Sequence, residues 1–173
     1  TVYFGVFDQL VLGEKPLFAF TSRRRRPPQD PINALLSFAY SLLAHDCASA
    51  LESVGLDAYV GFLHRDRPGR TSLALDLMEE LRPCMADRFV LTLINNRVVS
   101  KQDFDFRENG AIFLNDTGRR TFLKHWQERK RDTLTPPYLQ EKVPWGLVPY
   151  VQALLLARHL RGDLDGYPPF LWK

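Results

Sequence analysis

Apolar residues recur every three or four positions through most of this chain, which is the spacing of one face of a helix. The longest run follows Asp30 and Pro31, a capping residue and a residue that suits the first helical turn, and Gly55 is expected to end it. Shorter runs predict further helices over residues 1–12, 72–82, 86–94, 118–131 and 144–162. The pattern therefore predicts a mainly α fold.

One segment departs from the helical pattern. Asn109 and Gly110 readily form a tight turn, and residues 104–106 and 111–114 on either side of them favour strands. We therefore predict a small β-hairpin inside a multi-helix domain. With 173 residues, of which 45% are hydrophobic, the chain is long enough for one domain with a real core, and we expect residues 1–173 to form it.

The ends and one connector have features of their own. Residues 1–12 are helical in pattern from the first position, without Met or a capping signal, so we expect them to be the remainder of a truncated helix. Residues 23–30 contain four arginines followed by two prolines, a composition that is typical of a connector. The aromatic tail over residues 166–173 is expected to pack back onto the domain.

The composition indicates the cellular compartment of the protein and excludes some classes of chemistry. Its two cysteines, Cys47 and Cys84, form no C-x-x-C pattern, which favours a reducing cytoplasm. The formal net charge of +3 is modest, although the arginines are clustered. The sequence contains no secretory or transmembrane pattern, P-loop or dinucleotide fingerprint, so ATP- and NAD-dependent chemistry has no support.

The most informative group of polar residues lies between residues 61 and 83. Asp76 precedes Glu79 and Glu80 by three and four residues on a predicted helix, so the carboxylates emerge on neighbouring faces, and His64 approaches from the preceding segment. One imidazole with carboxylates suits Mn²⁺ or Mg²⁺ better than a structural Zn²⁺. The alternative is an ordinary solvated helix face beside an unrelated histidine.

Three arginines flank this histidine. Arg65, Arg67 and Arg70 accompany Pro68 and Gly69, whose presence indicates a surface loop. Guanidinium groups beside a metal would suit a phosphate ligand, so the three arginines are candidate nucleic-acid contacts.

Three stretches, in this order and separation, resemble a known family. They are RRRRPPQDPINALLSFAYSLL (residues 23–43), GLDAYVGFLH (residues 55–64) and SLALDLMEELRP (residues 72–83). On these stretches the chain resembles the C-terminal helical catalytic domain of the CRISPR-associated integrase, the nuclease that inserts new spacers into CRISPR arrays.

The resemblance implies a metal site. In the family a Glu, a His and an acidic residue on the following helix hold the metal. The last two match His64 and Glu79, and Asp76 matches a nearby second acid, so the resemblance implies catalytic and metal-binding roles for these three residues. The family's first Glu and its N-terminal β-rich domain would precede Thr1, so we expect a fragment with weak metal affinity and little or no integration activity of its own.

The resemblance also implies a reaction and partners. A DNA 3′-hydroxyl would attack a phosphodiester of the CRISPR repeat, which makes the protein a metal-dependent DNA endonuclease or integrase. The implied partners are DNA, as spacer precursor and as CRISPR repeat, a second and smaller CRISPR-associated adaptation subunit, and a second copy of the full-length chain. The setting would be cytoplasmic, without a membrane.

Two other functions stay open at this point. His45 and Asp46 are adjacent, as in HD-type metal phosphohydrolases, although no further histidines complete that pattern. Alternatively, the chain is a noncatalytic helical DNA-binding or assembly module, whose carboxylates serve only solubility and packing. Asn33, Ser37 and Tyr40 interrupt the long helix and are either close to a catalytic centre or ordinary capping and core hydrogen-bonding groups.

Overall fold

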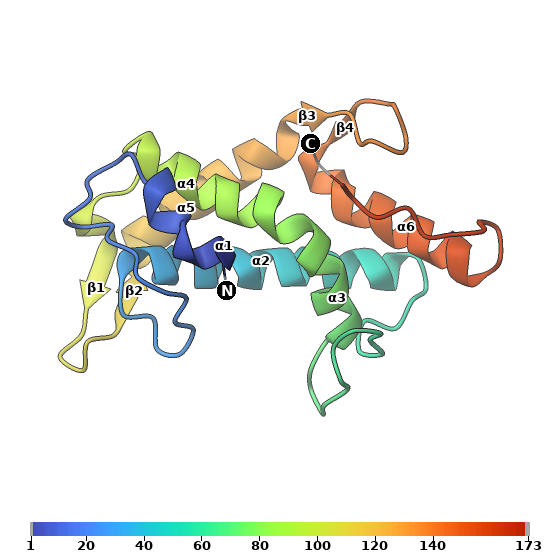
Figure 1. Ribbon diagram of the computed structural model, residues 1–173, viewed down its shortest axis with the longest axis horizontal. Helices are drawn as coiled ribbons and strands as arrows, with labels where there is room; N and C mark the ends of the chain where they lie inside the picture. Colours follow the sequence, from blue (N-terminus) through green and yellow to red (C-terminus); the bar gives the residue numbers. More distant parts are fainter. Residues whose placement is uncertain (1, 172–173) are drawn as a thin grey trace. The chain divides into compact units, whose positions relative to one another are not determined.

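The computed structural model describes residues 2–171, and most of them lie in helices (Figure 1). The described residues form only two small sheets, each of two antiparallel strands. The prediction of a mainly α fold with a hairpin near residues 104–114 is therefore confirmed, whereas the second strand pair was not predicted. The described chain divides into two units whose boundaries fall inside helical segments. The prediction of a single domain stays a prediction.

The first unit, residues 2–40 and 86–127, is built around aromatic side chains. Phe122 is fully buried, and the ring of Phe89 meets the rings of Phe122 and Trp126 edge to face, with centroids 5.1 Å apart in both pairs. Its elements are α1 (Val2–Gly5), the 3₁₀ helix Phe7–Leu10, the start of α2 (Pro31–Ser53), α4 (Arg88–Asn95), the 3₁₀ helix Lys101–Asp103, β1 (Phe104–Phe106), β2 (Ile112–Leu114) and the start of α5 (Asp116–Arg131).

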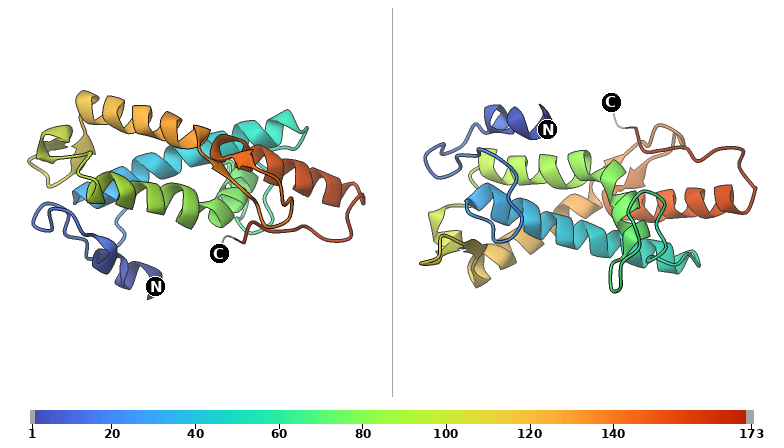
Figure 2. Two further views of the ribbon diagram at one scale, coloured as in Figure 1. Left: turned by 90° about the horizontal axis from the view of Figure 1, so that it is seen from above. Right: turned by 60° about the horizontal axis from the view of Figure 1, so that its bottom comes forward.

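The second unit, residues 41–85 and 128–171, contains the candidate site. Within it α3 contacts α6, and the chain that follows α6 runs back beside that helix (Figures 1 and 2). The buried ring of Phe170 contacts Trp145, so the expectation that the tail packs back is confirmed as far as Phe170, while Trp172 and Lys173 lie outside the described residues. The elements of the second unit are the remainder of α2 and α5, α3 (Ser72–Leu81), β3 (Thr133–Leu134), β4 (Val143–Pro144), the 3₁₀ helix Trp145–Leu147 and α6 (Val148–Leu160).

Helix α2 begins and ends as predicted. The Asp30 side chain accepts a hydrogen bond from the backbone N–H of Asn33 at 2.8 Å, and Gly55, with φ of +81°, reverses the chain after the last turn. By length and composition alone α2 could cross a membrane. A buried core helix passes the same test, and no membrane span is indicated here because most of the apolar positions of α2 are buried, among them Ile32, Leu35, Leu36, Ala39, Leu43, Cys47 and Leu51.

The helix predicted to stop before Pro83 does end at Leu81, but the chain stays helical. A π-helical segment, Arg82–Asp87, follows α3 directly and leads into α4. Because Pro83 has no backbone N–H and its ring would clash with the carbonyl four residues earlier, an ordinary α-helical turn is disfavoured there. The wider turn is the form in which the helical path continues past the proline.

Other boundaries differ because of contacts that periodicity does not reveal. The prediction of one helix over residues 1–12 is wrong for the described residues, since α1 ends at Gly5 and a 3₁₀ helix follows. There the Asp8 carboxylate accepts a hydrogen bond from the backbone N–H of Phe20, which ties this segment to the next loop. Helix α5 begins before Gly118, where a Cβ would lie only 2.3 Å from the carbonyl oxygen of Asp103.

Candidate active site

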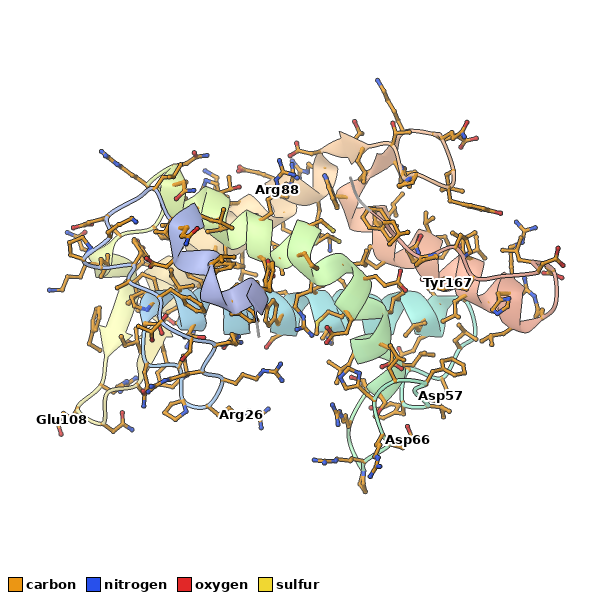
Figure 3. All side chains as sticks on the ribbon, viewed as in Figure 1. Arg26, Asp57, Asp66, Arg88, Glu108 and Tyr167 are labelled. Carbon is orange, nitrogen blue, oxygen red and sulfur yellow. The ribbon has the colours of Figure 1, made fainter. Side chains whose placement is uncertain are left out.

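The candidate site is built on the segment that joins α2 to α3, residues 54–71, called here the His64 loop (Figure 3). This loop is fastened to the start of α3. The carbonyl oxygen of Ala58 accepts hydrogen bonds from the N–H groups of Leu73 and Ala74, at 3.0 and 3.3 Å, and so occupies donors that the first helical turn leaves free. The Ser72 hydroxyl donates to the carbonyl oxygen of Arg65 at 3.3 Å. The loop therefore has a fixed path beside the helix.

Asp76 is the centre of this arrangement. Its Oδ2 accepts hydrogen bonds from the backbone N–H groups of Phe62 and Leu63, at 2.6 and 2.9 Å. Its Oδ1 accepts from the backbone N–H and the Nδ1 of His64, at 2.9 and 2.6 Å. Although burial raises the pKa of Asp76, the hydrogen bonds from Leu63, His64 and Phe62 outweigh it and lower that pKa below its ordinary value. Asp76 is therefore an ionised carboxylate that gathers three successive residues of the loop.

Gly61 makes this close approach possible. A Cβ at this position would lie 2.7 Å from the Ser72 Cβ, 2.9 Å from the His64 carbonyl oxygen and 3.0 Å from Asp76 Oδ2. Real Cβ atoms do not tolerate such contacts, so any side chain would lift the loop from the carboxylate.

The contact with Asp76 decides which nitrogen of His64 is available. Since Oδ1 is an acceptor, Nδ1 carries the proton, and a neutral imidazole then has its free lone pair on Nε2. Among residues 2–171, Nε2 has no hydrogen-bond partner, and the side chain is 26% exposed. A carboxylate on one ring nitrogen with the other nitrogen free is the arrangement typical of a metal-binding histidine.

Glu79 lies one helical turn after Asp76. Residues three apart on a helix have Cβ atoms about 5–6 Å from one another, so Glu79 and His64 both lie next to Asp76. The Glu79 side chain is 40% exposed and forms an ion pair with Arg82. A metal bound by Glu79 would therefore share its carboxylate with a guanidinium.

Glu80 has a different environment although it is the next residue. Its Oε2 accepts hydrogen bonds from the backbone N–H of Phe170 at 2.9 Å and from Gln152 Nε2 at 3.3 Å. Burial raises the pKa of the Tyr167 phenol, and the neighbouring Glu80 raises it further. Glu80 thus fastens the C-terminal segment to α3, and it is not directed to the His64 loop (Tyr167 is labelled in Figure 3).

The donors fit a divalent cation only in part. His64 Nε2 and the Glu79 carboxylate are borderline and hard donors of the kind that Mn²⁺ and Mg²⁺ accept. The Asp76 oxygens are already engaged by the loop. In the part of the chain that the structure describes, no three His, Cys, Asp or Glu side chains are grouped as a complete metal site.

The three arginines of the His64 loop are placed by a tight turn. The backbone N–H of Arg70 donates to the carbonyl oxygen of Arg67 at 3.0 Å, and Gly69 at the third position has φ of +73°. Proline followed by a glycine with positive φ is typical of a type II turn. Arg65 and Arg67 are exposed and Arg70 is half-buried. Within residues 2–171 no carboxylate forms an ion pair with any of the three guanidinium groups, so all three are available to an anionic ligand.

The polar residues of α2, Asn33, Ser37 and Tyr40, belong to the first unit and not to the candidate site. Arg23 Nη1 donates to Asn33 Oδ1 at 2.7 Å and Nη2 donates to Ser37 Oγ at 3.0 Å. The Arg23 guanidinium lies over the ring of Tyr40, whose hydroxyl donates to the buried Asp87. Asn33, Ser37 and Tyr40 therefore form a structural network inside the first unit and tie the arginine-rich connector to α2.

The second metal hypothesis loses support. Asp46 forms an ion pair with Lys130 at 2.9 Å, and the adjacent His45 is exposed. No group of histidines gathers around this pair among the described residues.

Two residues of the site were missed by sequence reasoning. Arg82 follows Glu79 by three positions, the ordinary spacing of a helical ion pair, so that signal was present. Gly61 stands three residues before His64, but nothing in its local pattern distinguishes it from a loop glycine. Its role follows only from the contacts with Ser72 and Asp76.

Comparison with known proteins now identifies the family. Residues 1–128 match the family described as CRISPR associated protein Cas1. The chain belongs to the Cas1 family. The family resemblance found in the sequence is therefore confirmed.

A curated Cas1 relative supports this family membership. The chain is 62% identical over 173 residues to "CRISPR-associated endonuclease Cas1 2" of Rhodospirillum rubrum, covering 100% of this chain and 50% of the relative. It therefore spans about half the length of the curated relatives it matches.

Two solved structures are similar to the chain. A casposase bound to its integration product matches with a TM-score of 0.87 and 30% identity over 99% of this chain and 48% of that one. A partial Cas6-RT-Cas1–Cas2 complex matches with a TM-score of 0.77 and 27% identity over 99% of this chain and 49% of the other.

Proposed function

We propose that the protein is a metal-dependent DNA endonuclease and integrase that inserts new spacer DNA into the CRISPR repeat array. The observation that carries this proposal is the Asp76 carboxylate on His64 Nδ1, which leaves Nε2 free as a metal ligand. Membership of the Cas1 family and likeness to a casposase bound to an integration product support the reaction class.

In this proposal His64 and Glu79 hold Mn²⁺ or Mg²⁺. The family resemblance implies a catalytic and metal-binding role for Asp76, whereas its engagement with the loop favours a positioning role: it fixes the imidazole and keeps the proton on Nδ1. The described residues supply two donors, so water and phosphate oxygens would fill the remaining coordination positions of the metal. Residues 1–173 alone are accordingly expected to bind metal weakly and to integrate DNA little or not at all.

The reaction is a transesterification. A DNA 3′-hydroxyl forms a new P–O bond to a phosphodiester of the repeat, and the P–O bond to the displaced 3′ oxygen breaks, which yields a new 3′-hydroxyl. One phosphodiester replaces another, so no nucleotide cofactor is required. A metal held by His64 and Glu79 would activate the attacking oxygen and neutralise charge on the phosphate. Arg65, Arg67 and Arg70 would contact phosphates of the bound DNA. With water in place of the hydroxyl, the same site cleaves DNA.

The partners proposed are spacer-precursor DNA, the CRISPR repeat, a Cas2-type adaptation subunit and a second copy of the full-length chain. The likeness to a Cas1–Cas2 complex supports the second subunit. Each is a nucleic acid or a CRISPR-associated protein, and we propose that the protein acts in the cytoplasm.

Strand transfer and cleavage on branched DNA test the proposal. The protein should be produced as its gene encodes it and assayed with Mn²⁺ and with a chelator. We expect metal-dependent products that His64→Ala and Glu79→Ala both abolish. DNA binding without any metal-dependent chemistry would favour the alternative, a noncatalytic DNA-binding or assembly module.

A further inference from the structure

Four residues of the His64 loop between positions 59 and 63 are apolar and exposed. The exposed fractions are 50% for Tyr59, 57% for Val60, 66% for Phe62 and 79% for Leu63. Four large apolar side chains within five positions are an unusual concentration for a surface loop, and such patches mark binding sites. The loop projects beyond the start of α3, where Asp57 and Asp66 are labelled (Figure 3).

The exposure of Phe62 and Leu63 results from the way in which Asp76 holds the loop. The backbone N–H groups of both residues point into the Asp76 carboxylate, so their side chains are turned away from it and toward solvent. The close contact at Gly61 keeps the backbone in this position. The apolar residues are therefore presented by the same device that orients His64.

The neighbouring charges indicate what binds there. Arg65 and Arg67, just after His64, are exposed and have no ion-pair partner among residues 2–171. A ligand that satisfies both features has flat uncharged faces joined by a negative backbone, which describes single-stranded nucleic acid. An apolar protein surface would leave the guanidinium groups without a counter-charge.

We propose that Tyr59, Phe62 and Leu63 form a platform on which unpaired bases of DNA stack, and that this platform holds the reacting strand end beside His64. The inference rests on the proposed function, because that function supplies a DNA strand end as the ligand. Two residues of extended chain span at most about 7 Å, so a base on Phe62 lies within roughly two stacked base steps of His64.

Binding of two DNA ends tests the platform. One probe is a duplex with a single-stranded 3′ end, and the other is the same DNA with abasic sites at its last three nucleotides, which removes bases and keeps phosphates. Binding is measured by fluorescence anisotropy with the protein as its gene encodes it, in the presence of a chelator. Because stacking on an aromatic side chain is worth about 5- to 140-fold in affinity per base, wild-type protein should bind the abasic end at least 5-fold more weakly.

The variants separate base contacts from phosphate contacts. Phe62→Ala should weaken binding of the intact end and lose the discrimination against the abasic end, whereas Phe62→Trp should keep both. Arg65→Gln should weaken both probes equally and lower the salt dependence by about one counterion. Leu12→Ala is the matched control, since Leu12 is as exposed as Leu63, at 79%, and lies in the other unit.

The outcomes are distinct. Equal binding of the two probes by wild-type protein would overturn the platform, as would an equal loss on both probes in Phe62→Ala. Unchanged DNA binding in Phe62→Ala with an altered oligomeric mass would instead assign residues 59–63 to a protein interface. Since binding is measured without metal, base discrimination can persist when strand transfer fails, and strand transfer can occur without base discrimination. Failure of the platform is thus distinguishable from failure of the proposed function.

Discussion

Replacement of Asp76 by asparagine tests how the His64 loop is held. Two hydrogen-bond donors face each oxygen of this carboxylate: backbone N–H groups of Phe62 and Leu63 on Oδ2, and two nitrogens of His64 on Oδ1. An asparagine must direct its NH₂ group at one of these pairs, whichever way it is turned. Two donors then lose their acceptor, at about 1–3 kcal/mol each. Because the loop is partly open to water, we expect a local cost of about 2–4 kcal/mol.

Amide hydrogen exchange measures this cost where it arises. A local destabilisation of about 2–4 kcal/mol corresponds to exchange roughly 30- to 700-fold faster at Phe62, Leu63 and His64 in Asp76→Asn. Mn²⁺ affinity should fall about 10- to 100-fold, as is usual when the partner of a metal-binding histidine is altered. Asp66→Asn is the matched control, since this exposed carboxylate of the same loop accepts one bond, from the Gly61 N–H at 3.2 Å, and its loss should cost under about 0.5 kcal/mol.

Two results would refute this reasoning. Unchanged exchange at the three amides would show that the carboxylate does not hold the loop. The second concerns the role of Asp76 toward the metal. If it acts through His64, Asp76→Asn should cost no further Mn²⁺ affinity in a His64→Ala background. An equal loss in both backgrounds would make Asp76 a direct ligand.

Four further outcomes follow from the geometry. Gly61→Ala should lower the free energy of unfolding by about 1–3 kcal/mol and abolish strand transfer. Gly166→Ala should change neither denaturant unfolding nor strand transfer, because a Cβ added there has no atom within 4 Å. Glu79→Gln should lower metal-dependent strand transfer by at least roughly 100-fold, with a change in thermal stability under about 0.5 kcal/mol because this side chain is exposed. Glu80→Gln should instead destabilise the C-terminal segment by about 1–3 kcal/mol and increase its limited proteolysis. Since the fold raises the pKa of the Tyr167 phenol, the stability that the protonated phenol contributes is fully present below about pH 10 and declines as the pH rises further. The melting temperature of Tyr167→Phe should therefore fall less steeply from pH 8 to 11 than that of the wild-type protein.

Local signals were sufficient where the determinants are local. Asp30 caps α2 and Gly55 ends it because both effects depend on a few neighbouring residues. The hairpin at Gly110, with φ of +78°, is predictable for the same reason. The structure of residues 1–12 was not predictable from local signals, because packing against Phe20 outweighs the helical periodicity of this segment.

The candidate site shows the same division. Helical spacing brings Asp76, Glu79 and Glu80 onto neighbouring faces of one helix, and that could be read from the sequence. It could not distinguish the two glutamates, since Glu80 is engaged by Phe170, ninety positions away in the chain. Nor could it show that the Asp76 oxygens are already occupied by a loop 12 to 14 residues earlier. Residue type and spacing identify candidates, whereas tertiary contacts decide which atoms remain free to bind.

The most direct test of this account is electron spin echo spectroscopy of Mn²⁺ bound to the protein as its gene encodes it. The free Nε2 of His64 should appear as nitrogen coupling from a single imidazole, and this coupling should disappear in His64→Ala while persisting in His45→Ala, a control at an exposed histidine. Mn²⁺ that binds without any imidazole coupling, or coupling that survives in His64→Ala, would contradict the assignment of His64 as the metal ligand.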